Sequence, residues 1–455
     1  MRKTNNTAQN QEHVTNRRLI TIIVLLTTFI SMMSQTMMVT ALPLIGNVMH
    51  EPLTTVQWLT TGYTLMIGII TPLTSNLYEK YSSRKIFLSL LIIFALGTGI
   101  AAISTNFWML LLGRLLQAAS GGFLMTFQMT TMMTIYPPAI RGTVMGLSTF
   151  VIAFGPAVGP TIAGFIVTNF DWRYLFISIL PIIIIIFFIS LWKFPNYSNT
   201  KPVKIDLISV IESFLAVTLI MLSITITTTH LSVGIAMLVI GLLIGGSFIY
   251  RQLHMKKPLL DIRILQQSSF LRMTVISIFA YIILVGLGQI FSIYAQVKLA
   301  ATSLTTGLIL LPGAILNAFS SIAVGKMYDN HGPKKLIFFG SLLMFVSFAL
   351  FFIPGLEITL GMLSIVYTII LLGIGFVFSP SLTEAFSDIP ASQISQATAL
   401  NNTLRQIFAS IMITIMIIVM TAPVSMAVGL KWTMLIGAFL SLFISISIIK
   451  FKSQP

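Results

Sequence analysis

Long apolar segments separated by short polar loops run through the whole chain. Because a helix needs about 20 apolar residues to cross the hydrocarbon core of a bilayer, each segment is predicted to be a transmembrane helix. Only 8% of the 455 residues are charged, against roughly 25% in soluble domains, which excludes a soluble multidomain enzyme. The fourteen predicted segments are 19–48, 56–78, 86–103, 107–134, 140–168, 172–192, 205–226, 231–250, 270–297, 303–325, 336–354, 358–383, 391–420 and 429–449.

The positive charges agree with a count of fourteen crossings. With the N-terminus inside, 21 of the 26 Lys and Arg residues lie on the inner side and 3 on the outer side. Cytoplasmic loops carry the excess of Lys and Arg in membrane proteins, so both termini are predicted to be cytoplasmic. The net charge of +15 then follows from topology and indicates no nucleic-acid partner. Two cations, Arg114 and Arg405, fall inside predicted helices.

Two loops in the two halves of the chain repeat each other. Residues 75–85 read SNLYEKYSSRK and residues 325–335 read GKMYDNHGPKK, an offset of 250 residues. A second repeat, Pro-Ala at 138 and at 390, has an offset of 252. These offsets predict two six-helix bundles separated by two additional helices, with a substrate site between the bundles. The expected parts are a tail (1–18), a first bundle (19–193), a linker with helices seven and eight (194–269), a second bundle (270–449) and a tail (450–455).

The segment 140–168 carries the most specific motif. It follows the pattern G-x8-G-x3-G-P-x2-G-G, with Ala at one glycine position, at Gly146, Gly155, Gly159, Pro160, Ala163 and Gly164. Glycines at such spacing also occur in ordinary small-residue packing between membrane helices. Together with the two repeated loops, and with Arg114 and Gln117 in the pattern R-x-x-Q, the chain resembles the fourteen-helix drug:H+ antiporters of the major facilitator superfamily. The likeness covers nearly the whole chain and is strongest to the lincomycin-resistance branch.

The resemblance implies an all-α polytopic membrane protein with the major facilitator fold, built of 14 transmembrane helices as two six-helix bundles plus an inserted two-helix hairpin. It implies proton-coupled efflux of amphipathic small molecules by alternating access, as in multidrug export and antibiotic resistance, from a bacterial cell membrane. The proton is the expected coupling ion and no cofactor is expected. The expected partners are small amphipathic substrates and membrane lipids, and we expect a monomer.

The repeated loops are expected to gate transport. Glu79 with Arg84 in the first loop, and Asp329 with Lys334 in the second, place an acid near a helix end followed by cations. Such a group can form a charge clamp that holds one conformation closed. The alternative is that these charges serve topology alone and are solvated.

The first helix lacks the aspartate that many relatives carry, because Ser34 and Gln35 stand there. Gln35 and Arg114 are predicted to share a depth in the outer half of the membrane, where a guanidinium needs a polar partner or a wet cavity. Tyr63 is expected to line that cavity. For Arg114 the resemblance implies a role in proton coupling or substrate binding, and a purely structural charge is the alternative.

The acid that carries the proton is left open by the sequence. Glu212 and Glu384 are the candidates, since a buried carboxyl has a raised pKa, but either could be a solvated residue at a helix end. Arg405 is predicted to lie near mid-membrane and to face the cavity or an acid. The buried cations also suit a second function, an exporter or flippase of one endogenous lipid or fatty acid.

Other classes of protein fit the sequence poorly. A membrane-embedded transferase should show clustered His, Asp or Glu at one membrane face, and the sequence shows no such cluster. The five histidines have no metal-ligand spacing, so we expect neither a metal site nor an enzyme. A channel is disfavoured by the repeat and by the glycine motif.

Overall fold

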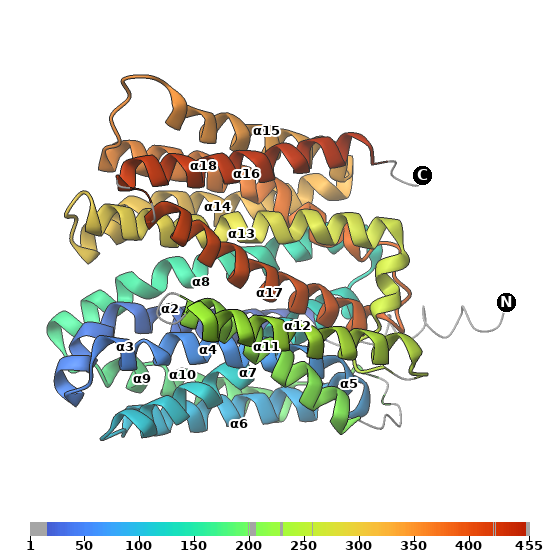
Figure 1. Cartoon of the computed structure of the whole chain (residues 1–455). Helices are drawn as coiled ribbons and strands as arrows, with labels where there is room; N and C mark the ends of the chain where they lie inside the picture. Colours follow the sequence, from blue (N-terminus) through green and yellow to red (C-terminus); the bar gives the residue numbers. More distant parts are fainter. Residues whose placement is uncertain are drawn as a thin grey trace. The chain divides into compact units, whose positions relative to one another are not determined.

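The computed structural model describes residues 16–451 except 199, 201–205, 228–230, 257, 422 and 424 (Figure 1). This part of the chain folds into helices joined by short loops, and twelve of them are long and apolar enough to cross a membrane. The chain is therefore an all-helical, multi-pass membrane protein. Most of the predicted tail 1–18, part of the tail 450–455, and the topological cations Lys201 and Lys204 lie outside the described residues.

The helices follow the predicted apolar segments. In the first part of the chain they are α2 (Arg17–Met49), α3 (Leu53–Val56), α4 (Trp58–Ile70), η1 (Thr71–Leu73), α5 (Thr74–Lys80), α6 (Ser83–Ala102), α7 (Phe107–Ile135), η2 (Pro138–Ile140), α8 (Arg141–Asn169), α9 (Tyr174–Ile177) and α10 (Leu180–Lys193). They continue with α11 (Leu207–Thr227), α12 (Leu231–His254), η3 (Ile262–Gln266), α13 (Ser268–Val297), α14 (Ser303–His331), α15 (Pro333–Ala349), η4 (Leu350–Phe352), α16 (Leu360–Ala385), α17 (Ile394–Thr421) and α18 (Met426–Ile449).

Twelve helices of the described residues are long and apolar enough to cross a membrane, so the predicted count of fourteen is not confirmed. The segment 56–78 is divided at Pro72, whose missing N–H converts one turn to a 3-10 turn between α4 and α5. The backbone remains right-handed helical through this turn. The segment 205–226 forms α11, which spans 21 residues.

The chain forms two compact units. The first comprises 1–137, 162–263 and 390–403, and the second comprises 138–161, 264–389 and 404–455. Two long helices, α8 and α17, therefore begin in one unit and end in the other. The α11–α12 hairpin belongs to the first unit.

Helix α7 is the central helix of the first unit. It packs against α2, α4 and α6, and most of its side chains are buried. Its contact with α6 is close, because a Cβ at Gly113 would lie 2.7 Å from the carbonyl oxygen of Gly97. Small residues permit such backbone approach between membrane helices. The central position of α7 means that any polar side chain on it must find partners inside the unit.

The second unit is organised around α16. This helix packs against α13, α14 and α15, and α18 packs against α13 and α15. A Cβ at Gly340 of α15 would lie 2.5 Å from the carbonyl oxygen of Gly373 of α16, so this pair also meets backbone to backbone.

The α11–α12 hairpin lies at the periphery of the first unit. Its two helices pack on each other, and α11 also contacts α4 (Figure 1). Few side chains of α12 are buried. Its large exposed side chains, such as Leu242, Leu243 and Tyr250, suit contact with lipid.

Candidate functional site

Arg114 is the centre of a buried polar cluster in the first unit. Its side chain is fully buried on α7, and its Nη1 donates to the Gln117 Oε1 (2.9 Å) and to the backbone oxygen of Ser34 (3.1 Å). Nη2 donates to the backbone oxygen of Gln35 at 3.5 Å. The guanidinium carbon lies 4.2 Å from the centre of the Tyr63 ring. The structure thus brings together Gln35, Tyr63, Arg114 and Gln117, which the sequence predicted as site residues, although Gln35 contributes its backbone.

The partners of Arg114 are neutral. In the part of the chain that the structure describes, Arg114 has no carboxylate partner, and its Nε has no hydrogen bond. A cation–π contact contributes about 2 kcal/mol when it is desolvated, less than a buried charge costs. Gln117 is held in turn by its Nε2, which donates to the Thr98 hydroxyl at 2.8 Å. The cluster therefore holds a positive charge inside the helix bundle without neutralising it.

Arg405 is the centre of a similar cluster in the second unit. It is fully buried on α17, and its guanidinium carbon lies 4.9 Å from the centre of the Tyr281 ring and 5.2 Å from that of the Phe378 ring. Gln406 donates to the Tyr281 hydroxyl at 3.4 Å. Each unit therefore buries one arginine against a tyrosine ring, with a glutamine beside it.

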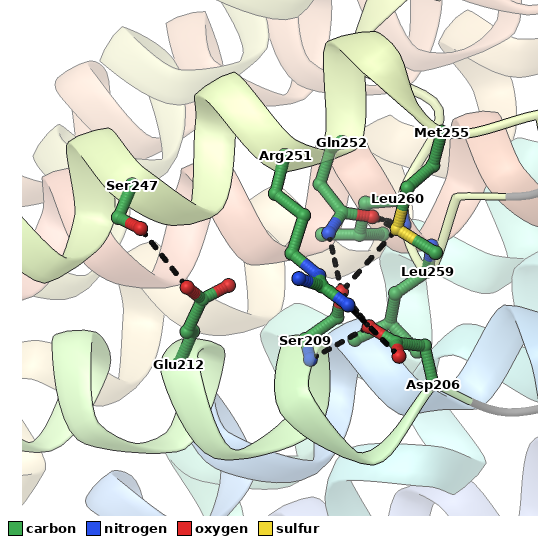
Figure 2. Close-up of polar contacts among 9 residues, drawn as sticks. All are labelled: Asp206, Ser209, Glu212, Ser247, Arg251, Gln252, Met255, Leu259 and Leu260. Atoms are coloured by element: carbon green, nitrogen blue, oxygen red, sulfur yellow. Dashed lines mark hydrogen bonds and ion pairs between the residues drawn. The ribbon is translucent and has the colours of Figure 1, made fainter.

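Glu212 and Glu384 lie in two other polar groups, one in each unit. Glu212 of α11 accepts a hydrogen bond from Ser247 of α12 at 2.9 Å (Figure 2). Glu384, near the end of α16, accepts from the Tyr328 hydroxyl at 2.5 Å. The alternative interpretation was that either acid is a solvated residue at a helix end. Glu384 is half-buried, and one carboxylate oxygen of Glu212 is buried without a hydrogen bond in the described part of the chain. Neither acid is therefore fully solvated.

Asp329 binds the first turn of α8. Its two carboxylate oxygens each accept a backbone N–H at 2.8 Å, one from Gly142 and one from Thr143, and Oδ2 also accepts from the Thr143 hydroxyl at 2.5 Å. The first turn of a helix has N–H groups without intrahelical partners and a positive dipole end, which together stabilise an anion. Asp329 thus joins the end of α14 to the start of α8 within the second unit.

Glu79 binds the first turn of α17 in a corresponding way. Its Oε1 accepts from the Ser395 hydroxyl (3.1 Å) and from Gln396 Nε2 (3.5 Å). Gln396 Nε2 also donates to Asn76 Oδ1 at 3.1 Å. The acids of the two repeated loops therefore contact the helices that follow the two Pro-Ala repeats.

The cations of the repeated loops do not pair with these acids. Arg84 donates to the carbonyl of Leu191, and the ion pairs within the described ranges are Arg173–Asp171 and Arg251–Asp206. No ion pair of Lys334 occurs there. Asp329 instead accepts two backbone N–H groups at the start of α8, and Glu79 accepts from the Ser395 hydroxyl and the Gln396 side-chain amide at the start of α17.

The glycine motif is partly a packing motif. A Cβ at Gly146 would lie 2.4 Å from the carbonyl oxygen of Ser321, and the Ser321 hydroxyl donates to the Gly146 carbonyl at 3.1 Å. A Cβ at Gly164 would meet no atom of the described residues within 4 Å beyond its own helix backbone. Gly155 and Gly159 are buried, and Pro160 lies inside α8.

Several residues of these clusters were not found from the sequence. Tyr281, Phe378 and Thr98 lie in segments with no motif, so the sequence carries no sign of their contact with a buried cation or its partner. Thr143 and Gln396 did have a signal, because they stand five and six residues after the two Pro-Ala repeats. No group of three metal-ligating side chains occurs among the residues that the structure describes.

The chain is similar in sequence to known membrane transporters. The sequence profile of the Major Facilitator Superfamily matches residues 24–414. The MFS-type transporter YcnB of Bacillus subtilis is 33% identical over 89% of this chain and 87% of its own length. The lincomycin resistance protein LmrB of Listeria monocytogenes is 32% identical over 87% of this chain and 84% of its own.

A solved structure agrees on the fold. The human organic anion transporter MFSD10 superposes with a TM-score of 0.68, covering 95% of this chain and 99% of its own at 12% identity. The chain belongs to the Major Facilitator Superfamily of transporters, in the branch that contains the lincomycin resistance proteins, as its motifs predicted.

Proposed function

We propose that the protein exports amphipathic small molecules from the cell in exchange for protons. The observation that carries this proposal is the pair of buried arginine clusters. In particular, all the partners of Arg114 in the described part of the chain are neutral. An uncompensated charge in a membrane helix is expensive and is typical of ion or substrate pathways. The kinship with LmrB, which is named for lincomycin resistance, supports an antibiotic-like substrate.

The proposed mechanism is alternating access in a protein that crosses the membrane fourteen times, with both termini in the cytoplasm. The proposed halves are the six-helix bundles 19–193 and 270–449. Glu79 on α17 and Asp329 on α8 would form two cytoplasmic clamps that hold one state closed and break in the other. Because α8 and α17 each contribute to both compact units, release of their first turns would free one end of each helix.

Transport into inverted membrane vesicles tests the coupling. We expect dye uptake driven by a proton gradient to stop when a protonophore collapses that gradient. Arg114→Ala should abolish uptake with expression unchanged. The matched control is Arg173→Ala, since Arg173 is a partly exposed cation in the connection between α8 and α9 that pairs with Asp171 at 3.3 Å. Uptake that ignores the gradient would refute proton coupling, and an active Arg114→Ala variant would remove Arg114 from the mechanism.

The proton carrier is proposed among Glu212 and Glu384. Each carboxyl has a hydroxyl partner, Ser247 or Tyr328, that can donate to the ionised form and accept from the protonated form. Glu212→Gln and Glu384→Gln keep the shape and remove the proton site. The variant that removes the proton-carrying acid should lose gradient-driven uptake and retain downhill exchange of substrate. The other variant should retain both activities.

A second candidate is export of one endogenous lipid or fatty acid. The observation that favours it is that both buried clusters are positive, which suits an anionic head group. Competition between a cationic dye and a fatty acid in the vesicle assay separates the two candidates, because only the true substrate class should inhibit at low concentration.

A further inference from the structure

A buried glutamine at the end of α12 organises the connection to α13. Gln252 has no exposed surface, and its Nε2 donates to the Ser209 hydroxyl of α11 at 2.8 Å (Figure 2). Its Oε1 accepts the backbone N–H groups of Leu259 (2.6 Å) and Leu260 (3.4 Å). A buried amide whose oxygen and nitrogen are both hydrogen-bonded fixes the geometry of its partners. Gln252 thus holds the start of the connection against both helices of the hairpin.

The neighbouring polar contacts close the same end of the hairpin. Asp206, which precedes α11, accepts from Arg251 Nε at 3.0 Å and Nη2 at 3.1 Å, and it also accepts from the Ser209 hydroxyl at 2.6 Å (Figure 2). Arg263 donates to the carbonyls of Leu253 and Met255. The connection is therefore folded back on the end of α12 instead of extending freely from it. We call residues 258–263 the strap.

The far side of the strap contacts the clamp at Glu79. The Leu259 carbonyl accepts from the Ser75 hydroxyl of α5 at 3.1 Å. The Asp261 N–H donates to Gln396 Oε1 of α17 at 3.2 Å, the same side chain whose Nε2 contacts Asn76 and Glu79. Strap, α5 and α17 are thus joined by hydrogen bonds within the first unit.

The packing of the strap supports a mechanical role. The side chains of Leu259 and Leu260 are buried to 1% and 2% exposure, and Ser75 to 1%. The first unit ends at Arg263, and the chain enters the second unit with Ile264. The strap is therefore both packed against the clamp and placed where the chain passes from one unit to the next.

We propose that Gln252 is a positioning residue of the transport cycle, and that the α11–α12 hairpin acts through the strap to hold the first turn of α17 on α5. The start of α17 is then held by three sets of contacts: those of Glu79, that of Asn76, and that of the strap. The proposal rests on the proposed function in one respect: it assumes that the contact between α5 and α17 opens during transport. Membrane lipids that move the hairpin would reach the clamp by the same contacts.

The test uses a buried reporter on α17. The chain has no cysteine, so Thr398→Cys introduces a single thiol at a fully buried position one turn after Ile394. The rate of maleimide labelling, measured in detergent without substrate or gradient, reports how often this part of α17 opens. Labelling does not depend on proton coupling, so its result stands whether or not the export assay succeeds.

Two variants remove contacts of the strap to different extents. Gln252→Leu removes its hydrogen bonds to Ser209, Leu259 and Leu260 and should accelerate labelling roughly thirtyfold. Ser75→Ala removes one hydroxyl contact and should accelerate it roughly fivefold, with little risk to folding. The matched control is Ser247→Ala, which breaks a polar contact of the same hairpin that is not joined to the strap.

A second reporter separates opening from unfolding. Ser120→Cys lies fully buried on α7 and should label at the same slow rate in every variant. A pair of substitutions tests the pathway: Gln252→Leu combined with Gln396→Leu should accelerate labelling by less than the product of the two single effects, because both act through one contact. In vesicles, Gln252→Leu should change the maximal rate and leave the half-saturating substrate concentration within about twofold.

The proposal is overturned by any of three results. The first is labelling at Thr398→Cys that is unchanged in both Gln252→Leu and Ser75→Ala. The second is a double variant whose effect equals the product of the single effects. The third is equal acceleration at the Ser120→Cys reporter, which would mean general destabilisation.

Discussion

The contact between Asp329 and α8 allows a quantitative prediction. Asp329→Ala removes three hydrogen bonds to a carboxylate, from Gly142 N–H, Thr143 N–H and the Thr143 hydroxyl. Bonds to a charged group contribute roughly 1.5–3 kcal/mol each, and about 1 kcal/mol each is reasonable for a half-buried carboxylate. The contact is thus stabilised by about 3 kcal/mol, so its loss should raise the open population roughly a hundredfold.

A thiol at Ser321 measures that population. Ser321 of α14 is fully buried and donates to the Gly146 carbonyl of α8, so Ser321→Cys should react with maleimide only when α8 leaves α14. Labelling should be roughly a hundredfold faster with Asp329→Ala and roughly tenfold faster with Asp329→Asn, which keeps one acceptor. Ser445→Cys, buried on α18, is the control for unfolding. A rate within twofold of the parent in Asp329→Ala would refute the assignment of Asp329 as a clamp.

Three further predictions follow from close contacts. Gly146→Ala should lower the thermal unfolding midpoint and the export rate, because its Cβ would lie 2.4 Å from a carbonyl oxygen of α14. The control Gly164→Ala should leave the midpoint unchanged, because its Cβ would enter open space. Equal midpoints in the two variants would contradict the packing role of Gly146. Arg405→Lys should reduce export strongly, since Lys lacks the planar group that stacks on two rings, while Tyr281→Phe keeps the ring and should retain most activity. Tyr328→Phe removes the donor to a half-buried carboxylate and should lower the unfolding midpoint by about 1–3 °C, and an unchanged midpoint would show that water replaces the hydroxyl.

The repeated loops show how far sequence comparison could reach. The two repeats, at offsets 250 and 252, each came from comparing the chain with itself. In the structure the acid of one repeat contacts the helix after the other, Glu79 on α17 and Asp329 on α8. The sequence contained both halves of each contact. Their pairing depends on which helix ends lie close together in the fold, and helical periodicity says nothing about that.

The inserted hairpin shows the opposite case. Its two helices were recognisable as apolar segments, and Glu212 stood out as an acid within one of them. Gln252 did not stand out, because a glutamine in a basic stretch is an ordinary residue, and Ser75 stood out only as the first residue of a repeated loop. Only the fold buries these two side chains. It also brings Ser75 to the carbonyl of Leu259, which is more than a hundred residues away along the chain.

The sequence by itself determined that this chain crosses a membrane and that it belongs among the major facilitator transporters. These properties follow from the cost of burying polar groups in lipid, which acts on each segment locally. The tertiary structure decided what each remaining polar residue does. Arg114 and Arg405 lie against tyrosine rings, and Asp329 lies on the first turn of α8, because desolvated charges take the donors, acceptors and ring faces that packing supplies.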